Sequence, residues 1–154
     1  MRWTVRTAQQ LANVSFALDS SDPKAIQAGL EVYDFSKGRP AINSTSLEAG
    51  RDVLMELARE HKCMLFANGS GASGMPQNAE QRVENMTQCM ALMDKANVPI
   101  EDRYLDPLVF PVGAGPQFGK DYLDAVGELR KRFPKVHIFG GLSNVSFGLP
   151  RRKL

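Results

Sequence analysis

Short carboxylate and amide side chains follow four of the apolar, β-forming runs in this sequence. Asp19 lies in ALDS, Asn43 lies in INSTS, Asp106 precedes Pro107 in LDP, and Asn144 follows a glycine pair in GGLSN. An amide offers a donor and an acceptor on one short arm. Since the carboxyl ends of parallel strands meet at one edge of a sheet, the sequence predicts one polar site built from these four side chains. An alternative interpretation is that each of them merely caps a turn or a helix.

The segments that must position these residues alternate between strand-like and helix-like patterns. Apolar β-forming runs predict short strands over Val14–Leu18, Pro40–Asn43, Cys63–Ala67, Arg103–Leu105 and Val136–Phe139. Apolar residues at helical spacing predict five helices. Three cover Trp3–Leu11, Ala79–Ala96 and about Lys120–Phe133, a fourth begins at Pro23, and a fifth ends at Lys62.

Two of the expected helices carry capping signals at their starts. Asp22 followed by Pro23 predicts an N-cap and a proline at the first helical position. Thr45 with Glu48 predicts a capping box for the helix that runs to Lys62. The buried stripes expected in three helices are Ile26, Leu30 and Tyr33, then Val83, Met86, Met90 and Met93, and finally Tyr122, Val126, Leu129 and Phe133. The methionines are interpreted as core filling.

Composition excludes several classes of protein. The chain has 154 residues, of which 43% are hydrophobic and 23% charged, as in an ordinary globular protein. Its 19 basic and 17 acidic residues give a net charge of +2, and three of the basic residues lie at 151–153. The body of the chain therefore lacks the basic stripe of a nucleic-acid-binding surface. No apolar run reaches membrane-spanning length, and the start has no secretory pattern. Cys63 and Cys89 are too far apart in sequence for a metal or redox pair, so we expect two reduced, buried thiols.

The order of the expected elements predicts an α/β fold with a parallel sheet and right-handed crossovers. The first strand–helix turn reads DSSDP and lacks the glycine fingerprint of a dinucleotide-binding, doubly wound sheet. Polar residues at the carboxyl ends of several strands are instead typical of a TIM-type (β/α)8 barrel. About five βα units can be counted, whereas a complete barrel needs roughly 250 residues. We therefore expect one domain over residues 1–154 that forms an incomplete barrel.

Four blocks in this order resemble a known family: ALDSSDPKAIQAGL, AINSTS, YLDPLVFPVG and GLSNVSFGLPRRKL. They are similar to the pterin-binding methyltransferases that pass a methyl group from methyltetrahydrofolate to a corrinoid. These are related to the folate domain of cobalamin-dependent methionine synthase and to dihydropteroate synthase. The resemblance runs from about Trp3 to Leu154 and implies a cytoplasmic enzyme of one-carbon metabolism. It further implies a corrinoid carried by a partner protein, no metal bound to this chain, and a homodimer in the full-length family form.

The resemblance assigns Asp19, Asn43 and Asp106 to pterin binding. A pterin presents two neighbouring N–H donors and a carbonyl acceptor at one edge, and a carboxylate accepts such a donor pair in a fork. Asp106 is the stronger candidate, because Pro107 fixes the following turn. Since Pro107 has no N–H, the carboxylate is expected to be free of a local turn bond.

The C-terminal block supplies the remaining site residues that the resemblance implies. Asn144 matches the residue that hydrogen-bonds N5 as it gains a proton during methyl transfer, and Ser143 beside it is expected to orient the amide. Arg152 is expected to stack on or bond the pterin or the glutamate tail of the folate, and Phe147 to wall the ring. Asn68 faces the same mouth of the barrel but has no firm counterpart in the family. His61 and His137 are interpreted as structural, because the nucleophile is the partner's Co(I) corrin.

The missing length leaves the activity of this chain as a separate question. Relative to the family, the chain begins in the helix after the second strand and ends just past the seventh. Either it is a fragment of a longer reading frame or two arcs pair to cover each other. We expect the fragment, with no turnover by the 154-residue form alone. One alternative is dihydropteroate synthase, but Asn144 and Val145 stand where that enzyme's basic pair is expected. Another is an inactive fragment without catalytic function.

Overall fold

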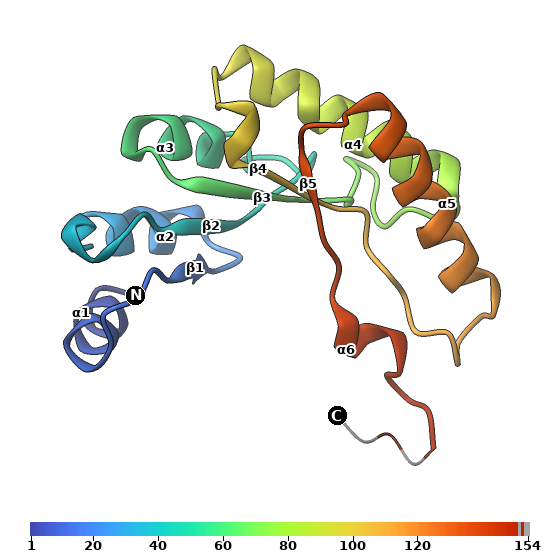
Figure 1. The fold of residues 1–154 in the computed structure, drawn as a ribbon, viewed down its shortest axis with the longest axis horizontal. Helices are drawn as coiled ribbons and strands as arrows, with labels where there is room; N and C mark the ends of the chain where they lie inside the picture. Colours follow the sequence, from blue (N-terminus) through green and yellow to red (C-terminus); the bar gives the residue numbers. More distant parts are fainter. Residues whose placement is uncertain (151, 153–154) are drawn as a thin grey trace.

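Five strands form one parallel sheet in which each strand pairs with the next strand along the chain, in the order β1-β2-β3-β4-β5 (Figure 1). The computed structural model describes residues 1–150 and 152. The strands are β1 (Ala17–Asp19), β2 (Ala41–Thr45), β3 (Met64–Asn68), β4 (Arg103–Asp106) and β5 (His137–Ile138). The helices are α1 (Arg2–Leu11), α2 (Pro23–Leu30), α3 (Val53–His61), α4 (Ala79–Lys95), α5 (Gln117–Arg132) and α6 (Leu142–Val145), with 3-10 turns η1 (Phe35–Lys37) and η2 (Ile100–Asp102).

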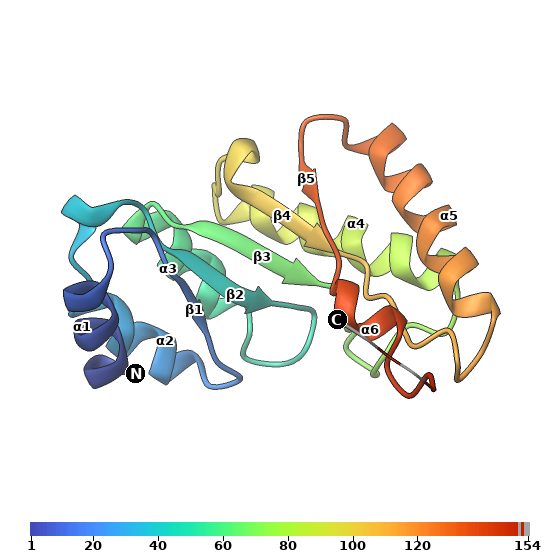
Figure 2. The same cartoon turned by 60° about the horizontal axis from the view of Figure 1, so that its bottom comes forward.

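The strand order confirms the expected incomplete barrel. A doubly wound sheet reverses its strand order at a switch point, whereas here the order follows the chain from edge to edge. The sheet is not closed, and β1 and β5 form its two edges. Figures 1 and 2 show α2, α3, α4 and α5 along the outer side of the curved sheet, as in one sector of a barrel.

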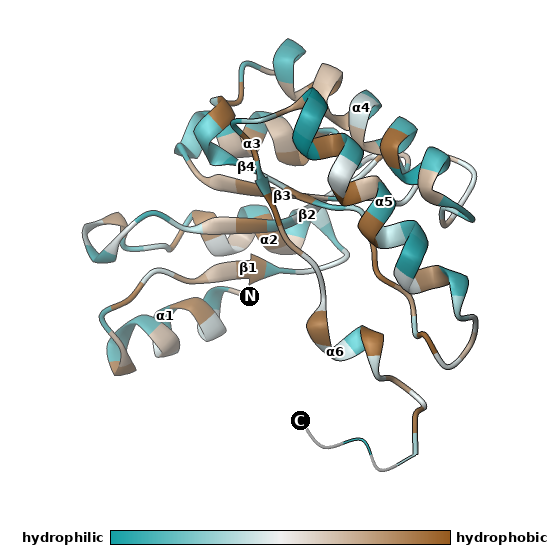
Figure 3. Ribbon diagram, turned by 45° about the vertical axis from the view of Figure 1, so that its right-hand side comes forward, coloured by the Kyte–Doolittle hydropathy of each residue, from teal (hydrophilic) through white to brown (hydrophobic). Residues whose placement is uncertain are grey.

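The core lies between the sheet and these helices. Leu65, Ala67 and Leu105 are fully buried, and they join one apolar cluster with Met86 and Met93 of α4. The methionine stripe is therefore core filling, as predicted from its spacing. Figure 3 shows hydrophobic and hydrophilic positions alternating along α4 and α5, which is the pattern of helices with one buried side.

One predicted helix start is confirmed and the other is wrong. The Asp22 carboxylate accepts a hydrogen bond from the Lys24 amide at 2.9 Å, and Pro23 is the first residue of α2. Thr45, in contrast, is a buried strand residue paired with β3, and its hydroxyl donates to the Arg51 carbonyl at 2.9 Å. Because Thr45 belongs to the sheet, it cannot cap a helix, and α3 begins only at Val53.

Both cysteines are free and buried, which agrees with the expectation of two structural thiols. Burial raises the pKa of the Cys63 and Cys89 thiols to about 12. Within residues 1–150 and 152, none of the helices combines the length and the apolar character needed to cross a membrane.

Candidate functional site

Strand register places two of the predicted site residues in one row across the sheet. Asp19 of β1 is paired with Asn43 of β2, Asn43 with Phe66 of β3, and Phe66 with Tyr104 of β4. His137 of β5 continues the row beside Tyr104. Paired residues of neighbouring strands point to the same face, so this row is a continuous strip on one side of the sheet.

A second row lies one step closer to the carboxyl end of the sheet. Asn68 is paired with Asp106, and each follows its aromatic neighbour, Phe66 or Tyr104, by two residues. Because side chains in a strand alternate between faces, both rows occupy the same face. The intervening Ala67 and Leu105 are packed against the helices, so the rows lie on the inner face of the arc. We call Asp19, Asn43, Asn68 and Asp106 the polar edge.

Hydrogen bonds tie the polar edge together between neighbouring strands. The Asn43 amide nitrogen Nδ2 donates to Asp19 Oδ2 at 3.2 Å, linking β1 to β2. The Asn68 Nδ2 donates to the Ser44 hydroxyl at 2.8 Å, linking β3 to β2. One bond thus joins two members of the polar edge, Asp19 and Asn43, and the other anchors Asn68 to the neighbouring strand.

Aromatic rings continue the row of Asp19 and Asn43 across the sheet and lie on the same face as Asn68 and Asp106. The Phe66 ring lies 5.1 Å from Tyr104 and 4.9 Å from Phe139, measured between ring centroids. The His137 ring stacks on Tyr104 at 4.3 Å. We call Phe66, Tyr104 and Phe139 the aromatic floor. These residues were not predicted from the sequence: the two-residue spacing to Asn68 places Phe66 on this face, but Tyr104 and Phe139 join it only through the strand register and the ring contacts.

Asp106 is the polar-edge residue whose ionisation the fold perturbs most clearly. Partial burial raises the pKa of its carboxyl above the usual value, and a hydrogen bond from the Leu108 amide partly opposes this. That amide donates to Asp106 Oδ1 at 2.9 Å. The expectation of a carboxylate without a local turn bond is therefore wrong. Pro107 has no N–H, but the next residue supplies one.

Asn144 lies beyond the strand end rather than on it. It belongs to the short helix α6, is exposed, and folds its amide back over Gly141, where a Cβ would lie 2.8 Å from Asn144 Nδ2. In the part of the chain that the structure describes, no hydrogen bond joins the Asn144 side chain to the polar edge. The structure thus places Asn144 past the same end of the sheet, where its backbone carbonyl accepts a hydrogen bond from the Phe147 amide at 3.2 Å, and its side chain stays apart from the polar edge.

The other predicted residues of this block do contact one another. Arg152 Nη2 donates to the Ser143 carbonyl at 2.9 Å, and the guanidinium lies 5.6 Å from the centre of the Phe147 ring. Both contacts keep the arginine beside α6, and the Phe147 ring is largely exposed.

Three hydrogen bonds to backbone groups fix the segment that carries Asn144. The Phe139 amide donates to the Leu105 carbonyl at 3.0 Å, and the Tyr122 hydroxyl of α5 donates to the Phe139 carbonyl at 3.0 Å. The Val112 amide donates to the Val145 carbonyl at 3.1 Å, so α6 is held against the loop that follows β4. The predicted residues of the last block therefore adjoin the loop that begins at Asp106.

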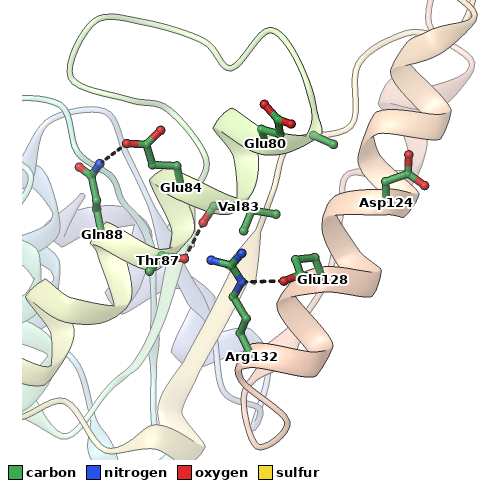
Figure 4. Close-up of a pocket in the computed structure, with 9 residues that line it drawn as sticks. Glu80, Val83, Glu84, Thr87, Gln88, Asp124, Glu128 and Arg132 are labelled. Atoms are coloured by element: carbon green, nitrogen blue, oxygen red, sulfur yellow. Dashed lines mark hydrogen bonds and ion pairs between the residues drawn. The ribbon is translucent and has the colours of Figure 1, made fainter.

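A groove of about 520 Å³ lies apart from this site, between α4 and α5 (Figure 4). Its side chains are largely committed to one another: Gln88 donates to Glu84 at 3.3 Å, and Arg132 donates to Glu128 at 2.8 Å. No residue of the polar edge lines it. Among the described residues, no three His, Cys, Asp or Glu side chains are grouped as a metal site.

Comparisons with known proteins bear on what such a site does. The sequence profile of the family described as "Pterin binding enzyme" matches residues 3–153. The methylcorrinoid:tetrahydrofolate methyltransferase of Eubacterium limosum is 29% identical over 157 residues, covering 100% of this chain and 57% of the relative. The methionine synthase of Mycobacterium leprae is 35% identical, covering 92% of this chain and 13% of the relative. That of Mycobacterium tuberculosis is 32% identical, covering 86% and 12%.

The chain spans little more than half the length of the first of these relatives and about an eighth of the other two. The profile match, in contrast, includes all five strands and both rows of the inner face. Because that match runs along nearly its whole length, the chain belongs to the family of pterin-binding enzymes.

Proposed function

We propose that this protein binds methyltetrahydrofolate at the polar edge and passes its N5-methyl group to the Co(I) corrinoid of a partner protein. The observation that carries the proposal is the half-buried carboxylate of Asp106, held on the same inner face as the aromatic floor. The family match and the printed names of two kinds of relative, one acting on a methylcorrinoid and tetrahydrofolate, support the choice of substrate class.

Binding depends on complementarity between the polar edge and the pterin edge. A carboxylate accepts two parallel N–H bonds, which matches the neighbouring donors of the pterin at Asp106. Asn43 both donates and accepts, so it suits the pterin carbonyl and its adjacent N–H, and Asp19 accepts from a ring amine. The aromatic floor presents an apolar surface beside the half-buried carboxylate, and hydrogen bonds are stronger where the surroundings are less polar.

Transfer depends on a group that binds N5 more strongly as the methyl group leaves. The N5–methyl bond breaks while N5 becomes protonated, and the corrinoid cobalt of the partner supplies the electron pair that takes the methyl group. Asn144 offers a carbonyl oxygen to the new N5–H, so its hydrogen bond is worth most in the transition state. Ser143 holds the amide near this position, while Phe147 and Arg152 enclose the ring and the folate tail.

The same residues serve both directions of the reaction. The Eubacterium limosum relative is named for transfer from a methylcorrinoid to tetrahydrofolate, which is the reverse of the direction proposed here. A group that stabilises the transition state accelerates both directions equally, because the forward and reverse steps share that state. The proposed direction therefore concerns the supply of methyl groups in the cell rather than the design of the site.

The first test is an equilibrium titration of the folded chain with methyltetrahydrofolate. We expect binding, and we expect Asp106→Ala to weaken it by an amount that corresponds to the loss of a charged acceptor, about 1.5–3 kcal/mol. Glu84→Ala, in the groove between α4 and α5, is the control and should leave the affinity unchanged. Equal affinities for the wild type and Asp106→Ala would remove Asp106 from the site. The second test places this segment within a closed barrel, adds a cob(I)alamin-loaded partner and follows oxidation of Co(I) spectroscopically. We expect transfer there and none from the 154-residue form alone.

A further inference from the structure

A buried arginine on α4 connects this helix to the loop that follows Asp106. The Arg82 side chain is fully buried, and its Nε donates to the Leu108 carbonyl at 3.1 Å. Its Nη1 donates to the Asn78 carbonyl at 2.9 Å, and the guanidinium lies 4.7 Å from the centre of the Phe110 ring. Within residues 1–150 and 152, the third nitrogen, Nη2, has no hydrogen-bond partner. A buried cation that hydrogen-bonds carbonyls, with the Asp121 carboxylate only as a charged neighbour, is costly, so its presence calls for a reason.

The bond to Leu108 holds that residue in an unusual conformation. Leu108 has a φ of 64°, in the left-handed region that L side chains rarely adopt. In this conformation its amide donates to Asp106 Oδ1 while its carbonyl accepts from Arg82. The same residue therefore connects the guanidinium to the carboxylate, one peptide group on each side of its Cα.

We propose that Arg82 is a positioning residue for Asp106. By binding the Leu108 carbonyl, Arg82 keeps Leu108 left-handed, and the Leu108 amide then fixes one oxygen of the carboxylate so that the other faces the ligand. The consequence for ligand binding rests on the proposed function. The positioning itself can be measured on the protein without any ligand.

The chemistry of this position suits arginine in particular. Nε and Nη1 donate to two carbonyls from different segments, the α4 N-cap and the loop after β4, in a planar fork that a lysine does not offer. The guanidinium also lies over the Phe110 ring, where its charge faces the ring's electrons. One turn further along the same side of α4, Asn85 Nδ2 donates to the Gly69 carbonyl at 2.8 Å, in the loop after Asn68. Helix α4 thus anchors the loops that follow both residues of the second row.

The groups around Asp106 determine how far its pKa reports on the hydrogen bond from Leu108. From α5 the titratable neighbour is Tyr122, whose pKa is raised by burial and by the charge of Asp106. From β3 the register partner is the neutral Asn68, and β5 contributes His137 beside Tyr104. Helix α4 contributes Arg82, which acts through Leu108. The hydrogen bond from Leu108 lowers the pKa of the Asp106 carboxyl against the larger effect of burial.

The experiment is an NMR titration of the Asp106 carboxyl carbon in the unliganded chain. Arg82→Met removes both donors, and we expect Leu108 to leave the left-handed region and the pKa of Asp106 to rise further. Adding Leu108→Gly to Arg82→Met should move that pKa back toward the wild-type value, because glycine adopts the left-handed region freely. Arg82→Lys is the milder variant should Arg82→Met fail to fold, and a smaller rise is expected for it.

A second buried arginine gives a matched control. Arg103, at the opposite end of β4 from Asp106, donates to the Val98 carbonyl at 3.0 Å and to Asp94 at 2.6 Å. Arg103→Met should destabilise the fold without moving the pKa of Asp106. The proposal is overturned if Arg82→Met and Arg82→Lys leave the pKa of Asp106 at its wild-type value, or if Arg103→Met raises that pKa as much as Arg82→Met does. It is also overturned if adding Leu108→Gly to Arg82→Met does not lower the pKa of Asp106 again.

Ligand binding provides the functional measurement. Loss of one oriented hydrogen bond predicts a three- to tenfold weaker affinity, roughly, for methyltetrahydrofolate in Arg82→Met at neutral pH. Leu108→Gly in the same variant should recover part of it. If the wild-type chain binds no folate while the NMR shifts follow the expected pattern, the proposed function fails and the positioning of Asp106 by Arg82 stands.

Discussion

The side-chain amide of Asn43 donates to the carboxylate of Asp19 across β1 and β2, with Nδ2 3.2 Å from Oδ2. The two residues are register partners, so they face each other directly on the inner side of the sheet. Their bond joins a neutral donor to a charged acceptor, and it determines which substitutions either position tolerates.

A second carboxylate opposite Asp19 is expected to be harmful. Asn43→Asp replaces the donor by a like charge, which should weaken folate binding and lower the free energy of unfolding by about 1 kcal/mol relative to Asn43→Ala. Asn43→Ala loses the hydrogen bond without adding charge. Denaturant unfolding at low and at 1 M salt separates the two effects, since screening should narrow the gap between the variants. A gap that is insensitive to salt would show that charge repulsion is not its cause.

The raised pKa of Asp106 predicts that its carboxylate lowers stability at neutral pH. The ordinary value is 3.8, and burial raises the pKa in the folded state above it. The charged form is therefore disfavoured by folding, and this cost is fully present above the folded pKa and vanishes as the pH falls below 3.8. Asp106→Asn should raise the free energy of unfolding at pH 7, and the two proteins should converge on acidification.

Glu128 gives the control of opposite sign. Its pKa is lowered by the hydrogen bond from Arg132. Glu128→Gln should therefore lose stability at pH 7, and this loss should disappear as the pH falls through the folded pKa. Unfolding curves for both variants at several pH values check the pair, and a stabilising effect of Glu128→Gln would contradict the assignment.

The role proposed for Asn144 separates the rate of transfer from the affinity for folate. In a protein that carries this segment within a closed barrel, Asn144→Ala should slow methyl transfer to Co(I) on the order of 100–1,000-fold while changing folate affinity much less. Stopped-flow oxidation of Co(I) measures the first quantity and an equilibrium titration the second. An unchanged transfer rate with a large loss of affinity would make Asn144 a simple binding residue.

Gly140 is expected to tolerate no side chain while Tyr122 holds the end of β5. A Cβ at Gly140 would lie 2.3 Å from the Tyr122 hydroxyl oxygen, which itself bonds the Phe139 carbonyl. Gly140→Ala should therefore cost about 1–3 kcal/mol. Combined with Tyr122→Ala, the loss should fall short of the sum by about 1 kcal/mol, because the clash is then gone. Strict additivity in this double-mutant cycle would rule out the clash as the cause.

The features that could be read from the sequence depend on local periodicity. The order of strands and helices, the Asp22 cap and the buried methionines of α4 follow from residues that lie within one or two turns of each other. Tertiary pairing overrode a local pattern at Thr45, where the capping-box spacing is present but the residue belongs to β2.

In the candidate site, too, local features could be predicted from the sequence and tertiary contacts could not. Asp19 and Asp106 lie at strand ends as expected, whereas the aromatic floor becomes visible only once the register pairs Phe66 with Tyr104. The turn bond at Asp106 was missed because it comes from Leu108, whose conformation depends on a helix 26 residues away in sequence. Asn144 was expected directly at the end of a strand. It lies on α6 instead, and the position of α6 depends on its hydrogen bond to the loop after β4, from the Val112 amide to the Val145 carbonyl.

The edge-to-edge strand order has a consequence for synthesis on the ribosome. Each strand from β2 to β5 pairs with the strand made just before it, so each βα unit can dock as soon as its own helix has emerged. No unit waits for a distant segment to be inserted between two finished neighbours. This strand order therefore permits the five units of this chain to dock one after another in the order in which they are translated.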